Sequence, residues 1–575
     1  MPMHHRIPAR TLPVALPAAL PAALPVALPA ALPAAPALAA PAAPAAAARA
    51  LAARAFLGVS PLKMGIFLGF GILGFGVSPA PAQTIINLTT GSTYARLTTA
   101  MGDTAGITDA TLLITADQTL VGYLNYDGKN NTTFTGSLAG ADPAGSRVTI
   151  TTAGAAVDAN RFMGRIAPGS TITLWNLDIV GGAGTAATSS GAFYFYGSDT
   201  GTTRILGDFT IRGFNINNQG AVIQNNTAGN SLVLGSPGAR VELSDNHGAS
   251  IGGAIRFSTA ITFDAAAVIL ANTSTGAGAA SGGALWANNI IFNSTATLSR
   301  NILHCTADGA VAANNGGGAL YAGDTAGAIR FAAAAVLSEN VNRNGTGGAL
   351  YTRGRVEALA GLTLTSNTAA RLANTAEVHG GAAYIQGGLN VAGALAAAGN
   401  SADGSGGALY LLGGGTMHGG SAFLNNTAGA GAGGGNGGAI YWAGPANATL
   451  ALIADTADIT FSGNTAAGAP HAIFWGNSTS GRANTLALHA DAARAIRFLD
   501  PVTGAGPAYG QLNTILITGA GETIFDTHKT TAVATTTIAP AATLRLANDA
   551  TFGNTGSGTL ALAAGARLAG SGTAQ

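Results

Sequence analysis

The sequence predicts an all-β protein that folds as a right-handed parallel β-helix, preceded by a cleavable leader. Two repeated marks carry this prediction: a Gly-Gly-Ala sequence followed by an apolar residue, and an asparagine that comes after a further apolar stretch. The composition agrees, since 84 of the 575 residues are glycine and only 9% are charged. Regular repeats indicate a stacked array, and a glycine-rich, weakly charged chain suits the many turns of a β-solenoid.

The Gly-Gly-Ala copies occur at regular distances. Consecutive second glycines lie 26 to 35 residues apart, and the repeated asparagine follows each of them after 18 to 26 residues. A segment of more variable length then leads to the next copy, as in stacked strands joined by tolerant loops. The second glycines are Gly253, Gly283, Gly318, Gly348, Gly381, Gly407 and Gly438, and the asparagines are Asn272, Asn301, Asn340, Asn367, Asn400, Asn426 and Asn464.

Both marks have a physical reason in a β-helix. Glycine permits a positive φ or a close approach between coils where a strand begins. Asparagine tolerates a left-handed backbone, and its side-chain amide can hydrogen-bond the amide of the next coil. Short apolar runs such as Ile290-Ile291-Phe292 and Leu362-Thr363-Leu364 predict the strands. At about 25–30 residues per coil, the chain beyond the leader gives about 16–20 coils.

The leader is different in composition from the rest of the chain. Its apolar run at 65–77 is too short to span a membrane and has the length of a signal-peptide core. Ala80-Pro81-Ala82 then forms a small-residue cleavage site, so we expect cleavage between Ala82 and Gln83 and export across the inner membrane. The predicted parts are 1–82, an Ala/Pro-rich extension with the signal peptide; 83–180, N-terminal coils and a cap; 181–480, the marked repeats; and 481–575, further coils.

The second residue after Gly-Gly-Ala is aromatic in most copies. Strand alternation places the preceding apolar residue in the core, so this position points outward, and Arg256 at the same position agrees with that orientation. Two interpretations stay open: a ladder that stabilises neighbouring coils, or an external strip that stacks against sugars or a partner. The strip consists of Trp286, Tyr321, Tyr351, Tyr384, Tyr410 and Tyr441.

Charge and cysteine content narrow the classes of partner. The net charge is +1, so no nucleic-acid footprint is expected. Cys305 is the only cysteine, so no internal disulfide forms, and we interpret it as a small buried residue. His247, His379 and His471 lie near the repeat marks and would bind a metal if they stacked on one face, but other repeats carry Asn, Ser or Thr at comparable places. We expect neither a metal nor a cofactor.

The alternating marks resemble a known family. Gly-Gly-Ala-[Ile/Leu]-Tyr alternating with Phe-x-x-Asn is similar to the paired repeat of the chlamydial polymorphic outer-membrane proteins. The second motif appears as Phe423-Leu424-Asn425-Asn426 and Phe461-Ser462-Gly463-Asn464, and as Leu-x-x-Asn in three other copies. The resemblance covers residues 190–475 well. It implies a type V secreted (autotransporter) passenger at the outer membrane or cell surface, often an adhesin, with a translocating β-barrel.

Such a barrel needs about 250–300 further residues. We therefore expect the translocator either in a longer reading frame or as a separate chain in trans.

The leading functional hypothesis is a surface-exposed or secreted adhesin-type passenger without catalysis, with host or environmental glycans or surface proteins as partners. A structural spacer stalk is the first alternative. A carbohydrate-active enzyme of the lyase or glycosidase type is the second, but that chemistry needs converging carboxylates, and the acidic residues of the repeats are dispersed.

Overall fold

The computed structural model describes most of residues 84–574, which belong to one compact unit that begins at Pro79. The leader and the predicted cleavage site between Ala82 and Gln83 lie outside the described residues. The other intervals outside the description are 105–106, 108, 127–130, 138–146, 154–160, 183–190, 196–199, 217–220, 226, 250, 277–280, 307–314, 372–377, 430–434, 477–482, 505–512, 527–534, 549 and 553–558.

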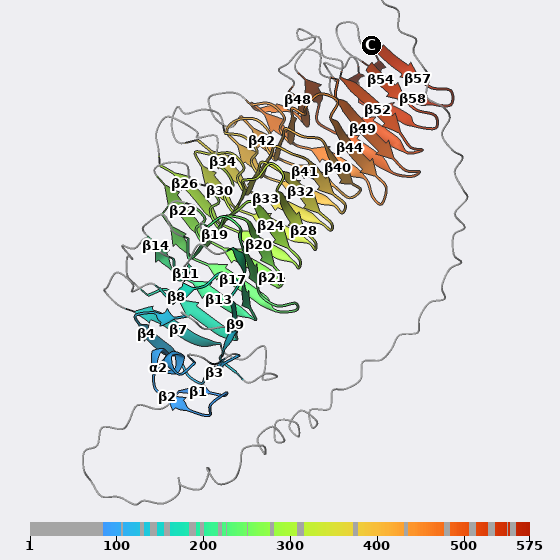
Figure 1. Ribbon diagram of the computed structural model, residues 1–575. Coiled ribbons are helices and arrows are strands. Elements are labelled where there is room, and N and C mark those ends of the chain that lie inside the picture. The colour runs from blue at the N-terminus through green and yellow to red at the C-terminus, as the bar shows by residue number, and fades with distance from the viewer. Residues whose placement is uncertain are drawn as a thin grey trace, which may run out of the picture. The chain divides into compact units, whose positions relative to one another are not determined.

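Each coil of the repeat region contributes one strand to each of four parallel sheets (Figure 1). One coil runs through β23 (Leu285–Ala287), β24 (Asn289–Phe292), β25 (Ala296–Ser299) and β26 (Ile302–Cys305), and the next begins with β27 (Leu320–Ala322). We name the four sheets by these strands: β24 belongs to sheet 1, β25 to sheet 2, β23 to sheet 3 and β26 to sheet 4. The fold is a parallel β-helix, as predicted.

The sheets differ in extent. Among the described residues sheet 1 has 18 strands, sheet 2 has 16, sheet 3 has 13 and sheet 4 has 10. The 16 strands of sheet 2 correspond to 16 coils, within the predicted range. The parallel part of sheet 1 runs from β3 (Thr111–Ile114) to β57 (Thr559–Leu562), and sheet 2 runs from β4 (Gln118–Val121) to β58 (Arg567–Gly570). Sheet 3 runs from β5 (Leu124–Asn125) to β51 (Val502–Gly504). Sheet 4 is parallel from β14 (Asn215–Ile216) to β46 (Thr465–Ala466) and ends with the antiparallel β47 (Ala469–Pro470).

The N-terminal coil is closed by non-repeating elements. Strand β1 (Ile85–Asn87) pairs antiparallel with both β2 (Thr93–Tyr94) and β3. Helix α2 (Leu97–Gly102) buries three apolar side chains in the adjoining core. Apolar residues of the first coil are thereby removed from water, as expected of a terminal cap. A short pair of β56 (Thr551–Phe552) and β59 (Thr573–Ala574) lies near the other end of the chain.

The main core is one continuous cluster of apolar side chains that extends from Ile85 to Phe552. Strand alternation supplies it: in β24 Ile290 and Phe292 are fully buried, while the intervening Ile291 is not. Because the coils stack in register, equal residues meet along the core. The rings of Phe263, Phe292 and Phe331 are 5.0 and 5.2 Å apart, and those of Phe423, Phe461, Phe498 and Phe525 are 4.6, 4.9 and 4.9 Å apart.

The repeated asparagines form a buried hydrogen-bonded ladder between sheets 2 and 4. Nδ2 of Asn301 donates to Oδ1 of Asn340 in the next coil at 2.9 Å and to the carbonyl of Ile269 in the previous coil at 2.9 Å. Oδ1 of Asn301 accepts from both N and Nδ2 of Asn272 at 3.0 Å. The amide is therefore fully satisfied although no part of it reaches water. The members are Asn246, Asn272, Asn301, Asn340, Asn367, Asn400, Asn426 and Asn464.

The expectation that these asparagines adopt the left-handed backbone is wrong. The left-handed residue is the one before each asparagine; for example, φ is 56° at Arg300 and 56° at Glu339. The turn places the asparagine directly after this residue, where its side chain enters the ladder. Glycine occupies the left-handed position at Gly399 and Gly463, where it relieves the strain of a positive φ.

The two glycines of Gly-Gly-Ala have separate roles. The first has a positive φ in all seven copies, from 66° at Gly252 to 74° at Gly317. The second allows adjacent backbones to approach closely: a Cβ on Gly283 would lie 1.8 Å from the carbonyl oxygen of Gly318. Neither position accepts a side chain without a change in the backbone, which explains why the pair recurs.

The predicted boundaries at 180 and 480 are not breaks in the sheets. Strand β10 (Leu177–Val180) pairs with β13 (Phe209–Arg212), and β44 (Thr449–Ala454) pairs with β49 (Thr485–Ala490). What distinguishes the marked repeats is sheet 4, which begins at Asn215 and ends at Pro470. The ladder ends there too, because Asp500 replaces asparagine: Oδ2 accepts from N and Nδ2 of Asn464, both at 2.8 Å.

Replacing Asn340 with alanine tests the ladder. The change leaves the carbonyl of Leu298 and both donors of Asn301 without their buried partner, so we expect a loss of about 3–5 kcal/mol in the free energy of unfolding, measured by denaturant titration. The exposed Asn390→Ala is the matched control and is expected within about 0.5 kcal/mol of the parent. Equal effects of the two substitutions would contradict a stabilising role of the ladder.

Candidate functional site

The predicted aromatic residues stack into one continuous column on the face of sheet 3 that points away from the core. Successive ring centroids from Trp286 through Tyr441 are 6.3, 4.9, 5.2, 4.9 and 4.5 Å apart, with interplanar angles of 3 to 10°. Phe474 extends the column at 5.6 Å from Tyr441. Strand register causes this, since Tyr321, Tyr351 and Tyr384 are paired partners in adjacent strands. The ladder interpretation is therefore sufficient to explain the tyrosines.

The column is not the exposed strip that the alternation predicted. Tyr321 is 4% and Tyr351 2% exposed, and the other four side chains are only partly accessible. At two copies, the described residues just before Gly-Gly-Ala pack on the rings: a Cβ on Gly316 would lie 2.3 Å from the ring of Tyr351, and the ring of His379 stacks on Tyr410 at 4.5 Å. Alternation fixed the orientation of the rings, but it could not show that the entering segment covers them.

Arg256 fits into the column because its guanidinium stacks on a ring, and not because the position is exposed, as the sequence led us to expect. Its guanidinium lies over the Trp286 ring, 5.5 Å from the centroid, and the residue is half-buried. Burial lowers the pKa of this arginine. A planar cation that stacks on an aromatic face replaces a ring in the series without needing exposure. The arginine was therefore no evidence of an exposed position.

Burial also sets the proton equilibria of the column. It raises the pKa of Tyr321 and of Tyr384 to about 12, because the phenolate would lose its hydration. Tyr351 is shifted in the same direction and accepts a hydrogen bond on its hydroxyl from Nε2 of Gln386 at 2.8 Å. These three hydroxyls therefore stay protonated to a higher pH than that of a free tyrosine, and the uncharged rings suit close stacking.

The three histidines considered as metal ligands are not brought together. His247 lies in sheet 4 and contacts Asn215 at 3.0 Å, whereas His379 and His471 flank the aromatic column. Nδ1 of His379 accepts the backbone N–H of Ser405 at 3.1 Å, which requires an unprotonated nitrogen. Within the described ranges, no group of three or more His, Cys, Asp or Glu side chains is placed to hold a metal ion.

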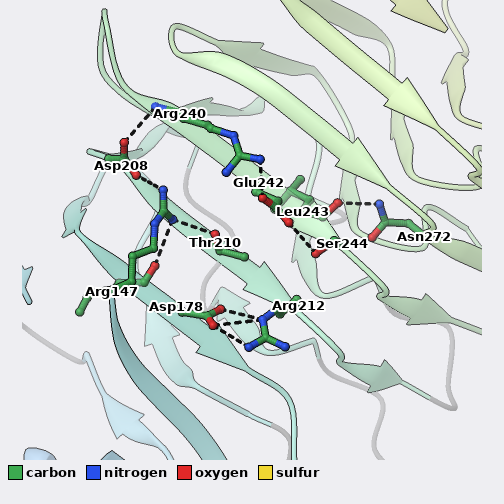
Figure 2. Close-up of polar contacts among 11 residues, drawn as sticks. Arg147, Asp178, Asp208, Thr210, Arg212, Arg240, Glu242, Leu243, Ser244 and Asn272 are labelled. Carbon is green, nitrogen blue, oxygen red and sulfur yellow. Dashed lines mark hydrogen bonds and ion pairs between the residues drawn. The ribbon is translucent and has the colours of Figure 1, made fainter. Parts of the chain in front are cut away.

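Charged side chains gather on the outer face of sheet 2 in its early coils (Figure 2). Arg147 forms an ion pair with Asp208, and Arg212 binds Asp178 through Nε and Nη2 at 3.0 and 2.7 Å. Arg240 pairs with Glu242 nearby, at 2.6 Å. These opposite charges neutralise one another at a partly exposed surface, so the cluster offers neither an excess of one charge nor a free carboxylate pair.

Within the described part of the chain, two open grooves lie on the outer face of sheet 1. The first, of about 320 Å³, is lined by residues of β32 (Arg355–Ala358), β36 (Leu389–Val391), β40 (Gly415–His418) and β44. Its polar side chains are Arg355, Asn390, Thr416 and Thr449. Arg355 also pairs with Glu357, which lies 4.0 Å from Nε of Arg330. The groove thus combines two hydroxyls and an amide with one accessible guanidinium.

The second groove, of about 450 Å³, lies on the early coils. Its lining contains Trp175, whose side chain is 39% exposed, and Leu88, which is 44% exposed. The remaining lining residues carry hydroxyls: Thr111, Thr133, Thr135, Ser137 and Thr173. The sequence did not lead us to this groove, because the early coils lack the Gly-Gly-Ala mark. The alternation Thr171-Ile172-Thr173-Leu174-Trp175 was the available signal for an outward tryptophan.

Comparisons with protein-family models, with curated proteins and with solved structures find no match to this chain. Among the described residues no helix has the length and apolar character needed to cross a membrane.

Replacing Tyr351 with alanine separates the two interpretations of the column. Loss of a buried, doubly stacked ring is expected to lower the free energy of unfolding by about 3–5 kcal/mol, whereas Tyr351→Phe keeps the ring and costs about 1 kcal/mol. Adhesion of the folded variant is expected to equal that of the parent. Loss of adhesion with unchanged stability would instead restore the column as a binding site.

Acid is expected to destabilise the protein through His379 and His471. Burial lowers the pKa of each from 6.5 to about 4, so between these values the unfolded chain binds more protons than the folded one. Their stabilisation is full above pH 6.5 and is lost as the pH falls to 4. Denaturation at several pH values measures it, with the double variant His379→Asn, His471→Asn as control. If the free energy of unfolding of the parent and of the double variant fell equally with pH, these two histidines would not be the cause of the acid destabilisation.

Proposed function

We propose that this protein is an exported, surface-exposed β-helical passenger of the adhesin type. It binds glycans or surface proteins through the outer face of sheet 1, and it has no catalytic role. The signal-peptide pattern and the resemblance of the repeats to outer-membrane passengers support export. The observation that carries the binding role is the position of both grooves on one face, while the aromatic column of sheet 3 is covered.

The lining of the grooves favours binding over hydrolysis. Neither lining contains an aspartate or a glutamate. Glycoside hydrolysis commonly uses two carboxylates that flank the scissile bond, and neither groove supplies such a pair. Hydroxyls, an amide, a guanidinium and an indole are instead the groups that recognise polar ligands without reacting with them.

Adhesion of the full chain tests the proposal. The protein, expressed with its own leader and a translocator, is expected at the cell surface, where external protease removes it from intact cells, and to increase attachment to immobilised glycans and cell layers. A triple variant of the sheet 1 face, Trp175→Ala, Arg355→Ala and Asn390→Ala, is expected to reduce attachment at least about tenfold at unchanged surface amount. Surface exposure without any attachment by the parent would favour the spacer alternative, and absence from both the surface and the medium would refute export.

A further inference from the structure

We propose that the groove between Leu88 and Trp175 binds a neutral pyranose ring of a glycan. This inference rests on the proposed function, because it assigns a ligand class to one part of the binding face. Three neighbouring strands of sheet 1 form the floor: β3, β6 (Thr132–Thr135) and β9 (Thr171–Trp175). Leu88 bounds the groove beside β3, where its backbone N–H donates to the carbonyl of Thr111 at 2.8 Å.

A column of threonine hydroxyls crosses the floor. Thr111, Thr133 and Thr173 are register partners in the three strands, and each is partly exposed while its neighbours in the strand face the core. None of the three hydroxyls forms a hydrogen bond with another described residue. Each can therefore both donate and accept, as a ligand with several hydroxyl groups requires. Adjacent hydroxyls follow the strand spacing, about 4.8 Å, so the column spans about 10 Å.

The indole of Trp175 supplies a platform beside this column. Thr135 is its register partner, and Gly207 of the following coil leaves room for the ring, since a Cβ at position 207 would lie 3.2 Å from Cε3 of the indole. The other tryptophans are engaged elsewhere: Trp442 and Trp475 are 0% and 1% exposed, and Trp286 stacks on Tyr321. Trp175 therefore presents an accessible ring that the aromatic columns do not use.

The chemistry of the lining selects a neutral sugar. Its seven residues include no ionisable side chain, so an anionic glycan or a nucleic acid would find no counter-charge there. A pyranose has an apolar C–H face that packs on an indole and a rim of hydroxyls that meets the threonines. The volume of about 450 Å³ lies within the usual range of ligand pockets.

Tryptophan fluorescence provides a direct test on the full chain. Iodide quenching reports mainly on Trp175, because it is the most exposed of the four tryptophans. Maltohexaose, cellohexaose and mannohexaose are the probes, and at least one is expected to reduce the quenching constant about twofold or more. Trp175→Ala is expected to lower the affinity for that oligosaccharide at least about tenfold, as measured by calorimetry. Val336→Ala, which truncates an exposed side chain on sheet 2, is the matched control and should leave the affinity unchanged.

A second variant separates binding from folding. Thr133→Val keeps the shape of the side chain and removes the central hydroxyl, so affinity is expected to fall about five- to tenfold with the unfolding midpoint unchanged. Three outcomes would overturn the assignment of a neutral sugar. They are protection of Trp175 from iodide by a heparin hexasaccharide alone, binding of an apolar dye alone, and no protection by any probe. If no oligosaccharide protects Trp175 while the parent still attaches to cells or immobilised glycans, the groove inference fails and the proposed function stands. If the parent attaches to nothing, the proposed function itself fails.

Discussion

The fixed register between coils is the constraint on which the rest of the structure depends, and the buried asparagine ladder is its clearest cause. Each amide donates to the coil on either side of it and accepts twice from one of them, so a shift of one residue would leave several buried polar groups unpaired. Backbone pairing alone would permit such shifts, because any two strands can pair. The ladder makes one alignment far more favourable than the others. It ends at Asp500, whose carboxylate accepts from Asn464 but has no amide hydrogen to pass on.

Because the coils stack in a fixed register, a residue that recurs at the same position of successive coils forms a column of stacked side chains. Phenylalanines stack in the core, and tyrosines stack on the outer face of sheet 3, at spacings set by the strands. The same geometry explains the exceptions. Arg256 remains compatible with the column because its guanidinium is planar, and glycine at Gly316 gives the ring of Tyr351 the space that a side chain would occupy. A column of stacked rings therefore follows from the fold and does not by itself indicate a ligand-binding site.

The repeat marks were enough to predict the architecture, because their physics is local. A left-handed turn, a glycine at a close contact and an asparagine at a fixed distance recur in the sequence as they do in space. Exposure is a different property, since it depends on segments that join the surface from elsewhere in the coil. Alternation placed Tyr351 on the outer face correctly, yet the segment through Gly316 buries it. Trp175 was missed for the converse reason, because it lies in coils without the marks and becomes notable only through its threonine neighbours in adjacent strands.

Sheets 3 and 4 have structural roles, so sheet 1 is the surface on which binding properties can vary most easily. Sheet 4 and the ladder hold the register, and the outer face of sheet 3 is occupied by rings and by the entering chain. Along sheet 1, in contrast, register partners change freely: Ile291, Arg330, Glu357, Asn390 and Thr416 follow one another in one outward column. Substitutions there alter charge and hydrogen-bonding capacity without touching the core or the ladder. A β-helix whose fold is secured at a few positions in each coil can therefore change what one face binds at little cost in stability.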